Sequence, residues 1–232
     1  MNKFLNYNLK IDKVKINAYI EHTALSPTLT VSDVDRLVEE AIQHNLFGIC
    51  IPPFWVKRAK REIGNSRVQL VTIAGFPLGY NMTETKIDEI KSALHNGADE
   101  IDLVWNISSF KTGMGWEKIE IVKCGKLVHE SQKLLKVIIE TAYLSEEEII
   151  QACKICADAG VDFVKTSTGF APAGAKVEHI ALMRKHLPES VGIKASGGIK
   201  NYDQALQMIE AGADRIGTSS GIAIVNESKN NL

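Results

Sequence analysis

The chain has 232 residues, of which 45% are hydrophobic and 24% are charged, and its formal net charge is −1 at pH 7. A charge near zero excludes strong electrostatic attraction to nucleic acid or to an anionic membrane. No apolar run approaches the roughly 18 residues of a membrane span, and the N-terminal segment MNKFLNYNLKIDKVK alternates polar and apolar residues, unlike a secretory signal. We therefore expect a cytoplasmic enzyme or binding protein with no nucleic-acid or membrane partner.

Short β-rich runs alternate with amphipathic helical stretches from one end of the chain to the other. The predicted strands are AYIEHTAL, FGICIPP, QLVTIAGFP, EIDLVWNI, LLKVIIETA, DFVKTSTG, VGIKASGG and RIGTSSG. After the first strand, SDVDRLVEEAIQH has an apolar stripe at helical spacing, with Ser32 as the predicted N-cap. After the fifth, Ser145 and Glu148 have the spacing of a capping box. Helices that follow strands predict parallel pairing with crossover connections.

One phrase recurs before three of the strands, as HNGADEIDLV, DAGVDFVKTS and EAGADRIGTS. In each copy a helix is expected to end near a glycine, Gly97, Gly160 or Gly212, which supplies a left-handed cap. About eight βα units over this length are what a (β/α)8 TIM barrel requires. A doubly wound open sheet is the alternative, but no Gly-x-Gly-x-x-Gly turn follows the first strand. No linker divides the chain, so we predict one α/β domain, a (β/α)8 barrel over residues 1–232.

The sequence has four cysteines, and two of them, Cys153 and Cys156, match C-x-x-C by spacing. They lie inside a helical pattern, whereas a redox pair needs the helix N-terminus, where a thiolate is stabilised. The favoured interpretation is a pair of structural helix cysteines. The six histidines have no ligand-like spacing, so we expect no metal site.

Charged residues occur inside strands whose other residues are apolar. Side chains alternate between the two faces of a strand, so Lys165 shares a face with Phe163, and Lys194 shares a face with Gly192. By the same alternation, Asp102 lies opposite the apolar face of EIDLVWN. In a barrel these faces line the pore, and active sites lie at the C-terminal ends of the strands. The pattern predicts that two lysines and one aspartate converge inside the barrel.

A buried ion pair between Asp102 and one lysine is the structural alternative, and it leaves the second lysine without a counter-ion. Buried ion pairs are poor stabilisers, and two neighbouring ammonium groups disfavour each other's charged form. An uncharged lysine amine attacks carbonyl groups to give Schiff bases. We therefore predict that Lys165 is a nucleophile.

Glycine and hydroxyl residues follow the last three predicted strands, in TSTG, SGG and GTSSG. Such turns bring backbone N–H groups close to an anion, and barrels often bind phosphate after strands seven and eight. Tight turns with no ligand are the alternative. The candidate phosphate-binding residues are Thr168, Gly169, Gly197, Gly198, Ser219 and Ser220.

With these segments in order, the sequence resembles the 2-deoxyribose-5-phosphate aldolase family over nearly its whole length. DFVKTSTGF is similar to that family's Schiff-base strand, VGIKASGGIK to its second-lysine strand and GADEIDLV to its aspartate strand. The resemblance implies a homodimeric class I aldolase on a (β/α)8 barrel, acting in deoxyribose phosphate catabolism without a metal or organic cofactor. The implied reaction cleaves deoxyribose 5-phosphate to acetaldehyde and glyceraldehyde 3-phosphate.

The resemblance also implies a role for each candidate residue. Lys165 would form the imine with the substrate aldehyde, while Lys194 would keep that amine uncharged and join the proton relay. Asp102, through a water molecule, would act as general acid and base. Thr23 and Cys50 match the family's pocket wall, although a buried structural role for Cys50 is equally open.

The sequence departs from the family pattern at three places. Phe170 stands where some members have lysine, so phosphate binding is expected to depend on backbone and hydroxyl donors. Glu21 replaces a common aspartate, which we expect to matter little. The tail NESKNNL lacks the C-terminal tyrosine that some members use at the enamine, which affects the expected protonation rate.

Three other functions remain open from the sequence alone. A sugar-phosphate isomerase on the same barrel would need a carboxylate base at a strand end, for which Glu140 is the candidate. A non-catalytic sugar-phosphate sensor would keep the phosphate loops but have no use for Lys165. A different Schiff-base aldolase would share the lysine and differ only in its substrate.

Overall fold

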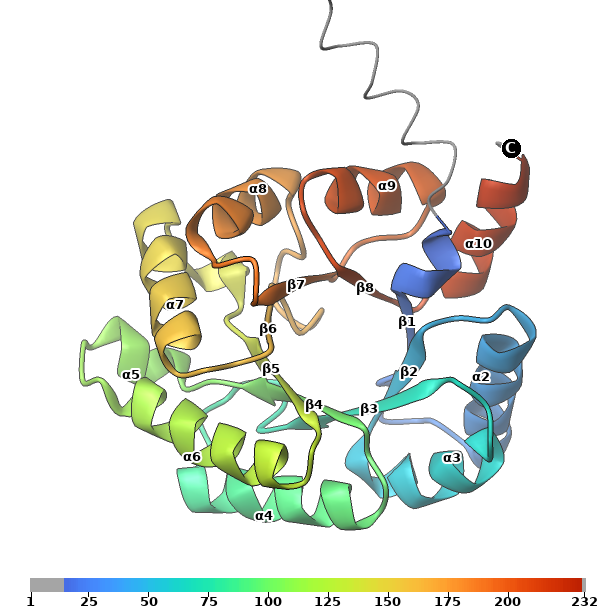
Figure 1. The fold of residues 1–232 in the computed structure, drawn as a ribbon, viewed down its shortest axis with the longest axis horizontal. Helices are drawn as coiled ribbons and strands as arrows, with labels where there is room; N and C mark the ends of the chain where they lie inside the picture. The colour runs from blue at the N-terminus through green and yellow to red at the C-terminus, as the bar shows by residue number, and fades with distance from the viewer. Residues whose placement is uncertain (1–14, 231–232) are drawn as a thin grey trace, which may run out of the picture.

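Figure 1 shows the computed structural model, which describes residues 15–230, as an inner ring of strands surrounded by helices. Eight parallel strands close into a barrel in chain order. They are β1 (Ile20–Thr23), β2 (Gly48–Ile51), β3 (Gln69–Ala74), β4 (Glu100–Val104), β5 (Leu134–Ile138), β6 (Phe163–Lys165), β7 (Gly192–Ser196) and β8 (Arg215–Thr218). The predicted (β/α)8 barrel is confirmed, and the open-sheet alternative is excluded.

Helices follow the strands and cover the outside of the barrel. They are α2 (Val31–Gln43), α3 (Val56–Ile63), α4 (Thr83–His95), α5 (Ile107–Lys111), α6 (Trp116–Glu130), α7 (Glu146–Asp158), α8 (Val177–His186), α9 (Tyr202–Glu210) and α10 (Gly221–Asn230). Short 3-10 turns add η2 (Ile16–Tyr19), η3 (Pro53–Trp55) and η4 (Thr141–Tyr143). Within residues 15–230, no helix is long and apolar enough to cross a membrane. The predicted domain bounds, the N-terminal segment and the end of the tail extend outside the described residues.

Helix α2 begins two residues earlier than the sequence pattern predicts. Its N-cap is Thr30 and not Ser32, because Asp33 stands at the right spacing to close a capping box with Thr30. The equivalent partner for Ser32 would be Asp35, whose carboxylate instead pairs with Arg58 of α3 at 2.7 and 2.8 Å. Because Asp35 pairs with Arg58, it cannot close a capping box with Ser32, whereas Asp33 can close one with Thr30.

The recurring Gly-x-Asp sequence lies at the N-terminal ends of the barrel strands. The backbone φ is 101° at Gly97, 74° at Gly160 and 113° at Gly212. Each following aspartate accepts a strand N–H, with Asp99 bonded to Leu70 at 3.2 Å, Asp162 to Leu135 at 2.8 Å and Asp214 to Ile193 at 2.8 Å. The repeat thus ends a helix and ties its turn to the preceding strand, which explains why it recurs before strands.

Helix α7 begins with the predicted capping box of Ser145 and Glu148. Cys153 and Cys156 follow well inside the helix and are fully buried. Burial raises the pKa of Cys153 to about 12 and that of Cys156 well above its ordinary value. The structural interpretation of the C-x-x-C spacing is confirmed, since neither thiol is poised as a thiolate.

The inside of the barrel has two chemically different halves. On β2 and β3, Cys50, Val71 and Ile73 form a small apolar cluster. Ile73 is paired in register with Asp102 of β4, where the charged half begins. A buried surface that is apolar on one side and charged on the other is a setting for chemistry on a small organic molecule.

Candidate active site

Three charged side chains from three strands meet inside the barrel. Lys165 ends β6 and is paired in register with Lys194 of β7, so both point to the same face. Asp102 of β4 faces them, and its Oδ2 accepts a hydrogen bond from the Nζ of each lysine at 2.7 Å. Lys165 is 2% exposed, and the other two are fully buried. The structure therefore brings together the three residues that strand alternation places in the pore.

Three more charged residues complete this group, which we call the pore cluster: Glu21, Glu100, Asp102, Lys136, Lys165 and Lys194. The Nζ of Lys136 lies 3.2 Å from Oδ1 of Asp102 and 3.6 Å from Oε1 of Glu21, and it also contacts Glu100. Glu21 accepts a hydrogen bond from Lys194 as well. Three lysines thus face three carboxylates, and the cluster is neutral when all six are ionised.

The expectation that the second lysine lacks a counter-ion is wrong. Glu21 and Asp102 both contact Lys194, so its charge is fully matched. Glu21, which seemed a minor departure in the sequence, links the two deeper lysines. Lys136 and Glu100 were missed, although each carries the same signal, a charge inside a buried strand.

The matched charges fix the ionisation of two members of the pore cluster. Burial tends to raise the pKa of Asp102, but Lys136, Lys165 and Lys194 outweigh it, and that pKa lies well below its ordinary value. Burial tends to lower the pKa of Lys194, but Asp102 and Glu21 outweigh it and raise that pKa. For Glu100, burial prevails over Lys136 and raises the pKa. Asp102 is therefore a carboxylate, and Lys194 an ammonium, throughout the neutral range.

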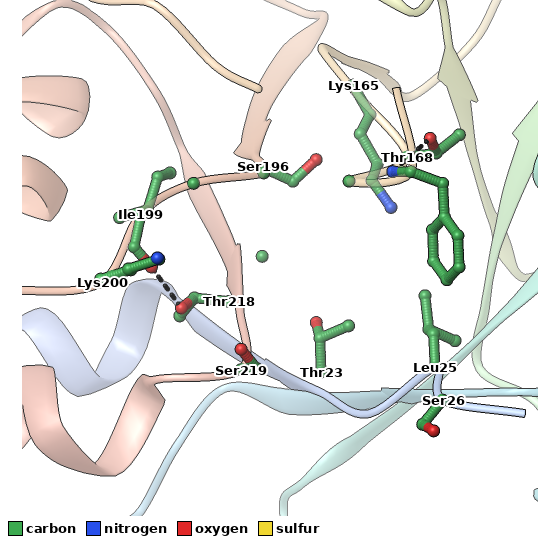
Figure 2. Close-up of a pocket in the computed structure, with 15 residues that line it drawn as sticks. Thr23, Leu25, Ser26, Lys165, Thr168, Ser196, Ile199, Lys200, Thr218 and Ser219 are labelled. Carbon is green, nitrogen blue, oxygen red and sulfur yellow. Dashed lines mark hydrogen bonds between the residues drawn. The ribbon is translucent and has the colours of Figure 1, made fainter. Parts of the chain in front are cut away.

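A cavity of about 290 Å³ opens above Lys165, between the C-terminal ends of β1, β6, β7 and β8. Figure 2 shows the Lys165 amine pointing into this cavity, with Lys200 on the opposite side and Thr23 between them. Lys165 is the member of the pore cluster that lines the cavity. A carbonyl compound in the cavity would thus meet this amine and no other lysine of the cluster.

The far end of the cavity is built to receive an anion. Gly169, Gly197, Gly198 and Ser219 line the cavity, and their backbone N–H groups donate to no acceptor within residues 15–230. Lys200 adds a positive charge at the same end. Free amides and an ammonium at the ends of β7 and β8 can bind phosphate. The expectation that only backbone and hydroxyl donors serve here was incomplete, because the turn after β7 brings Lys200 back to the cavity.

The remaining predicted site residues are divided between the cavity and its surroundings. Thr23 and Thr168 line the cavity. Cys50 does not, because it lies deeper in the apolar cluster, where burial raises its pKa to about 11. Ser220 also lies outside the lining, and its N–H donates to Oγ1 of Thr218 at 2.9 Å. Glu140, the candidate isomerase base, is not part of the lining either.

One wall of the cavity is apolar. Phe170 lines it, is 56% exposed and contacts Phe76 edge-on at 5.3 Å between ring centroids. Leu25 adds a further aliphatic surface. The position that the sequence marked as a departure from lysine is therefore a hydrophobic edge beside the anion-binding end.

Within residues 15–230, no three His, Cys, Asp or Glu side chains gather as a metal-binding group. The cavity is lined by an amine that has an adjacent carboxylate, and by N–H groups that can donate hydrogen bonds to an anion. On a (β/α)8 barrel, this combination defines the class of lysine-dependent aldolases that act on phosphorylated carbonyl compounds.

Comparison with known proteins narrows this class to one family. The model of the DeoC/LacD family of aldolases matches residues 9–227. Deoxyribose-phosphate aldolase of Thermococcus gammatolerans is 49% identical over 218 residues, which cover 93% of this chain and 97% of that protein. The corresponding enzyme of Brevibacillus brevis is 46% identical over 217 residues, with the same coverage of both chains. The chain therefore belongs to the DeoC/LacD family of aldolases.

Solved structures agree with this assignment. The aldolase QR15 superposes with a TM-score of 0.90 at 40% identity, covering 94% of this chain and 98% of that one. The deoxyribose phosphate aldolase of Aeropyrum pernix, described as tetrameric, superposes with a TM-score of 0.88 at 29% identity over the full length of both chains. Fold, site and sequence thus point to the same family.

Proposed function

We propose that this protein cleaves 2-deoxy-D-ribose 5-phosphate to acetaldehyde and D-glyceraldehyde 3-phosphate through an imine on Lys165. Its activity is that of a deoxyribose-phosphate aldolase, a carbon–carbon lyase, as in its relatives. The observation that supports the choice of lysine is position, because Lys165 is the pore-cluster amine that reaches the cavity. Access to a carbonyl group in the cavity gives a lysine inside a buried strand its use.

In the first half of the reaction the uncharged amine of Lys165 adds to C1 of the open-chain sugar. Asp102, whose Oδ2 lies 2.7 Å from this nitrogen, accepts the proton that the nitrogen releases. The carbinolamine oxygen takes a first proton from solvent water, and Asp102 returns its proton to the resulting hydroxyl group, which leaves as water and gives the iminium. The low pKa of Asp102 keeps it ionised at the start of each cycle.

In the second half the C3 hydroxyl loses its proton and the bond between C2 and C3 breaks. The electron pair of that bond moves into the iminium to give an enamine, and glyceraldehyde 3-phosphate leaves as the aldehyde. We assign the hydroxyl proton to Asp102 acting through a water molecule. The enamine then takes a proton at C2, and hydrolysis releases acetaldehyde and restores the amine.

The deeper members of the pore cluster hold the proton carrier in place. Lys194 and Lys136 contact opposite oxygens of Asp102, at 2.7 and 3.2 Å. Glu21 and Glu100 in turn neutralise these lysines. We therefore assign Lys194 to the orientation of Asp102 and to the proton relay, since preorganised charges stabilise a transition state without reorganisation.

The anion-binding end accounts for the phosphate. The free amides of Gly169, Gly197, Gly198 and Ser219, together with Lys200, would hold the 5-phosphate across the cavity from Lys165. Binding energy from this remote group can orient C1 at the amine. Thr23 lies between the two ends, where it can contact the sugar.

Reduction with borohydride in the presence of acetaldehyde tests the assignment. The imine becomes a stable ethyl adduct, and peptide mass spectrometry should locate it on Lys165. An adduct on Lys194 or Lys200 instead would refute the assignment. Release of glyceraldehyde 3-phosphate from deoxyribose 5-phosphate in the presence of a chelator tests the reaction and its independence from metal.

The rival functions are less well supported. An isomerase would need Glu140 in the cavity, which that residue does not line. A sugar-phosphate sensor would have no use for an amine beside a buried carboxylate. A Schiff-base aldolase of different substrate range would be recognised in the same assay, because it would release a different pair of products.

We also propose that the protein is a cytoplasmic homodimer, as its family resemblance implies. Light scattering on the purified full chain measures the oligomeric state directly. A monomer at micromolar concentration would contradict this part of the proposal.

A further inference from the structure

Glu140 carries a buried carboxylate that the proposed chemistry does not use. It follows β5, is 2% exposed and lies outside the cavity lining. Its backbone φ is 54°, in the left-handed region that non-glycine residues rarely adopt. Burial raises the pKa of this carboxylate against its hydrogen bonds to Thr168, and its Oε1 is buried with no hydrogen-bond partner within residues 15–230. A strained backbone and a buried carboxylate with an unpaired oxygen both cost free energy, so we expect other contacts of Glu140 to offset that cost.

The other carboxylate oxygen is bonded to the turn that follows β6. Oε2 of Glu140 accepts the N–H of Thr168 at 3.1 Å and the hydroxyl of Thr168 at 2.5 Å. The same hydroxyl oxygen accepts the N–H of Phe170 at 3.1 Å. These bonds use the amides on both sides of Gly169 and leave its own N–H without an acceptor within residues 15–230. Gly169 is the residue of this turn that contributes to the anion-binding end.

The turn after β6 also abuts the second anion-binding turn. A methyl group built on Gly197 would come within 3.5 Å of both the Cα of Gly169 and the Cβ of Ser167. The two turns thus lie about one methyl group apart, and the hydroxyl of Ser196 joins them by donating to the carbonyl oxygen of Ser167 at 2.5 Å. A shift of residues 167–170 would displace the free amides on both turns.

We propose that Glu140 is a positioning residue, which fixes the 167–170 turn so that the amides of Gly169 and Gly197 converge on the substrate phosphate. It acts through Thr168 and touches neither substrate nor Lys165. This inference rests on the proposed function, because it assumes that the anion at this end is the 5-phosphate. It also explains the left-handed backbone at Glu140, which turns the carboxylate away from the cavity and toward the β6 turn.

The substitution Glu140→Gln tests the inference with almost no change of shape. The single amide oxygen of glutamine can still accept both bonds from Thr168, but it carries no negative charge, so their charge assistance is lost. We expect KM for deoxyribose 5-phosphate to rise about tenfold, the loss typical of a hydrogen bond to a charged group. KM for unphosphorylated deoxyribose and the extent of acetaldehyde trapping on Lys165 should stay at wild-type values.

Two further variants separate positioning from stability. Glu117→Gln changes another buried carboxylate, which accepts from the hydroxyl of Ser109 at 2.8 Å at the start of α6, away from the cavity. It should lower the melting temperature without changing KM for either sugar. Thr168→Val removes the hydroxyl bond of the same link and keeps the N–H bond. The double variant should show the KM of a single one, since the two residues act as a unit.

The outcomes distinguish this inference from the proposed function. An equal rise in KM for both sugars, an unchanged KM, or additive effects in the double variant would overturn the role of Glu140. Thr168→Val alone decides the matter if Glu140→Gln does not fold. Failure of the wild-type protein to be trapped on Lys165 would overturn the proposed function instead.

Discussion

Two buried lysines of this protein, Lys86 and Lys165, each pair with one carboxylate but differ in the rest of their surroundings. Each Nζ lies 2.7 Å from a carboxylate oxygen, on Glu120 for Lys86 and on Asp102 for Lys165. Lys86 also donates to the carbonyl oxygens of Gly79 and Val104, at 2.6 and 2.9 Å. Its three donors are therefore all used, outside the barrel wall and out of contact with solvent.

Among the residues that the structure describes, Lys165 has one hydrogen-bond acceptor, Asp102, and its amine opens onto a cavity. An ammonium that donates three good hydrogen bonds gains nothing by losing its proton. An amine with a single acceptor and an adjoining cavity has room for a carbonyl carbon. Burial and an ion pair thus do not distinguish the two lysines, whereas unused donors facing a cavity do.

The carboxylate partners of the two lysines, Glu120 and Asp102, differ in the direction of their pKa shifts. Burial prevails at Glu120, where Lys86 is the opposing charge, and raises its pKa. At Asp102 three lysines outweigh burial, and the pKa falls well below its ordinary value. One carboxylate serves a closed structural pair, while the other is held ionised beside the cavity.

The substitution Lys165→Met should have the largest effect on activity. We expect turnover to fall by roughly 10⁴-fold or more, because the covalent route is lost, and borohydride should leave no adduct. The fold should persist, since Asp102 keeps Lys194 and Lys136 as partners. Retention of substantial activity by a correctly folded variant would contradict the nucleophile assignment.

The substitution Lys86→Met should have the largest effect on stability. It leaves Glu120 buried without its cation and two carbonyl groups without a donor, at a cost of about 3–5 kcal/mol in free energy of unfolding. Urea denaturation measures this loss. At a temperature where the variant stays folded, kcat and acetaldehyde trapping should match the wild type, and a fall in kcat equal to that of Lys165→Met would erase the contrast between the two lysines.

The opposite pKa shifts predict two stability slopes of opposite sign. The unfolded chain binds a proton at Asp102 near pH 3.8, before the folded protein does, so the free energy of unfolding falls as the pH drops below this value. At Glu120 the folded protein keeps its proton above pH 4.5, where the unfolded chain has lost it, so this group lowers stability as the pH rises through its raised pKa.

Variants at these two positions should each weaken one slope. Urea titrations from acid to neutral pH should show that Asp102→Asn weakens the dependence on the acid side. Glu120→Gln should weaken the dependence above pH 4.5, to which Glu100 and Glu140 also contribute. Identical pH profiles for the wild type and both variants would show that the two carboxylates do not differ as described.

The sequence predicts the barrel and the three central residues because both depend on local rules. Alternation along a strand assigns a face, and a charge on a buried face is conspicuous at Lys165, Lys194 and Asp102. The glycine phrase predicts helix ends for the same reason, since a left-handed cap is a local property. These features need no knowledge of which strands are neighbours.

The rest of the site depends on tertiary structure. Lys136 is a charge inside a buried strand, as Lys165 is, but its place beside Asp102 follows from register, which is a property of two strands. Lys200 reaches the cavity because the turn after β7 folds back, and Glu140 leaves it because its backbone is left-handed. Cys50, at a strand end in the sequence, lies too deep to line the cavity. Depth in the pore and the course of loops cannot be predicted from strand alternation.

The smallest predicted effect tests the hydrophobic edge beside the anion-binding end. Phe170→Lys would add a second cation to the cavity lining that includes Lys200, at a position that is more than half exposed. Because exposed charge pairs contribute about 0.2–1 kcal/mol, KM for deoxyribose 5-phosphate should fall by only about two- to fivefold. The gain should disappear at high salt, where exposed charges are screened, and Phe170→Leu should show none of it. A KM that is unchanged at low salt would place this side chain beyond reach of the phosphate and leave Lys200 to act without a second cation.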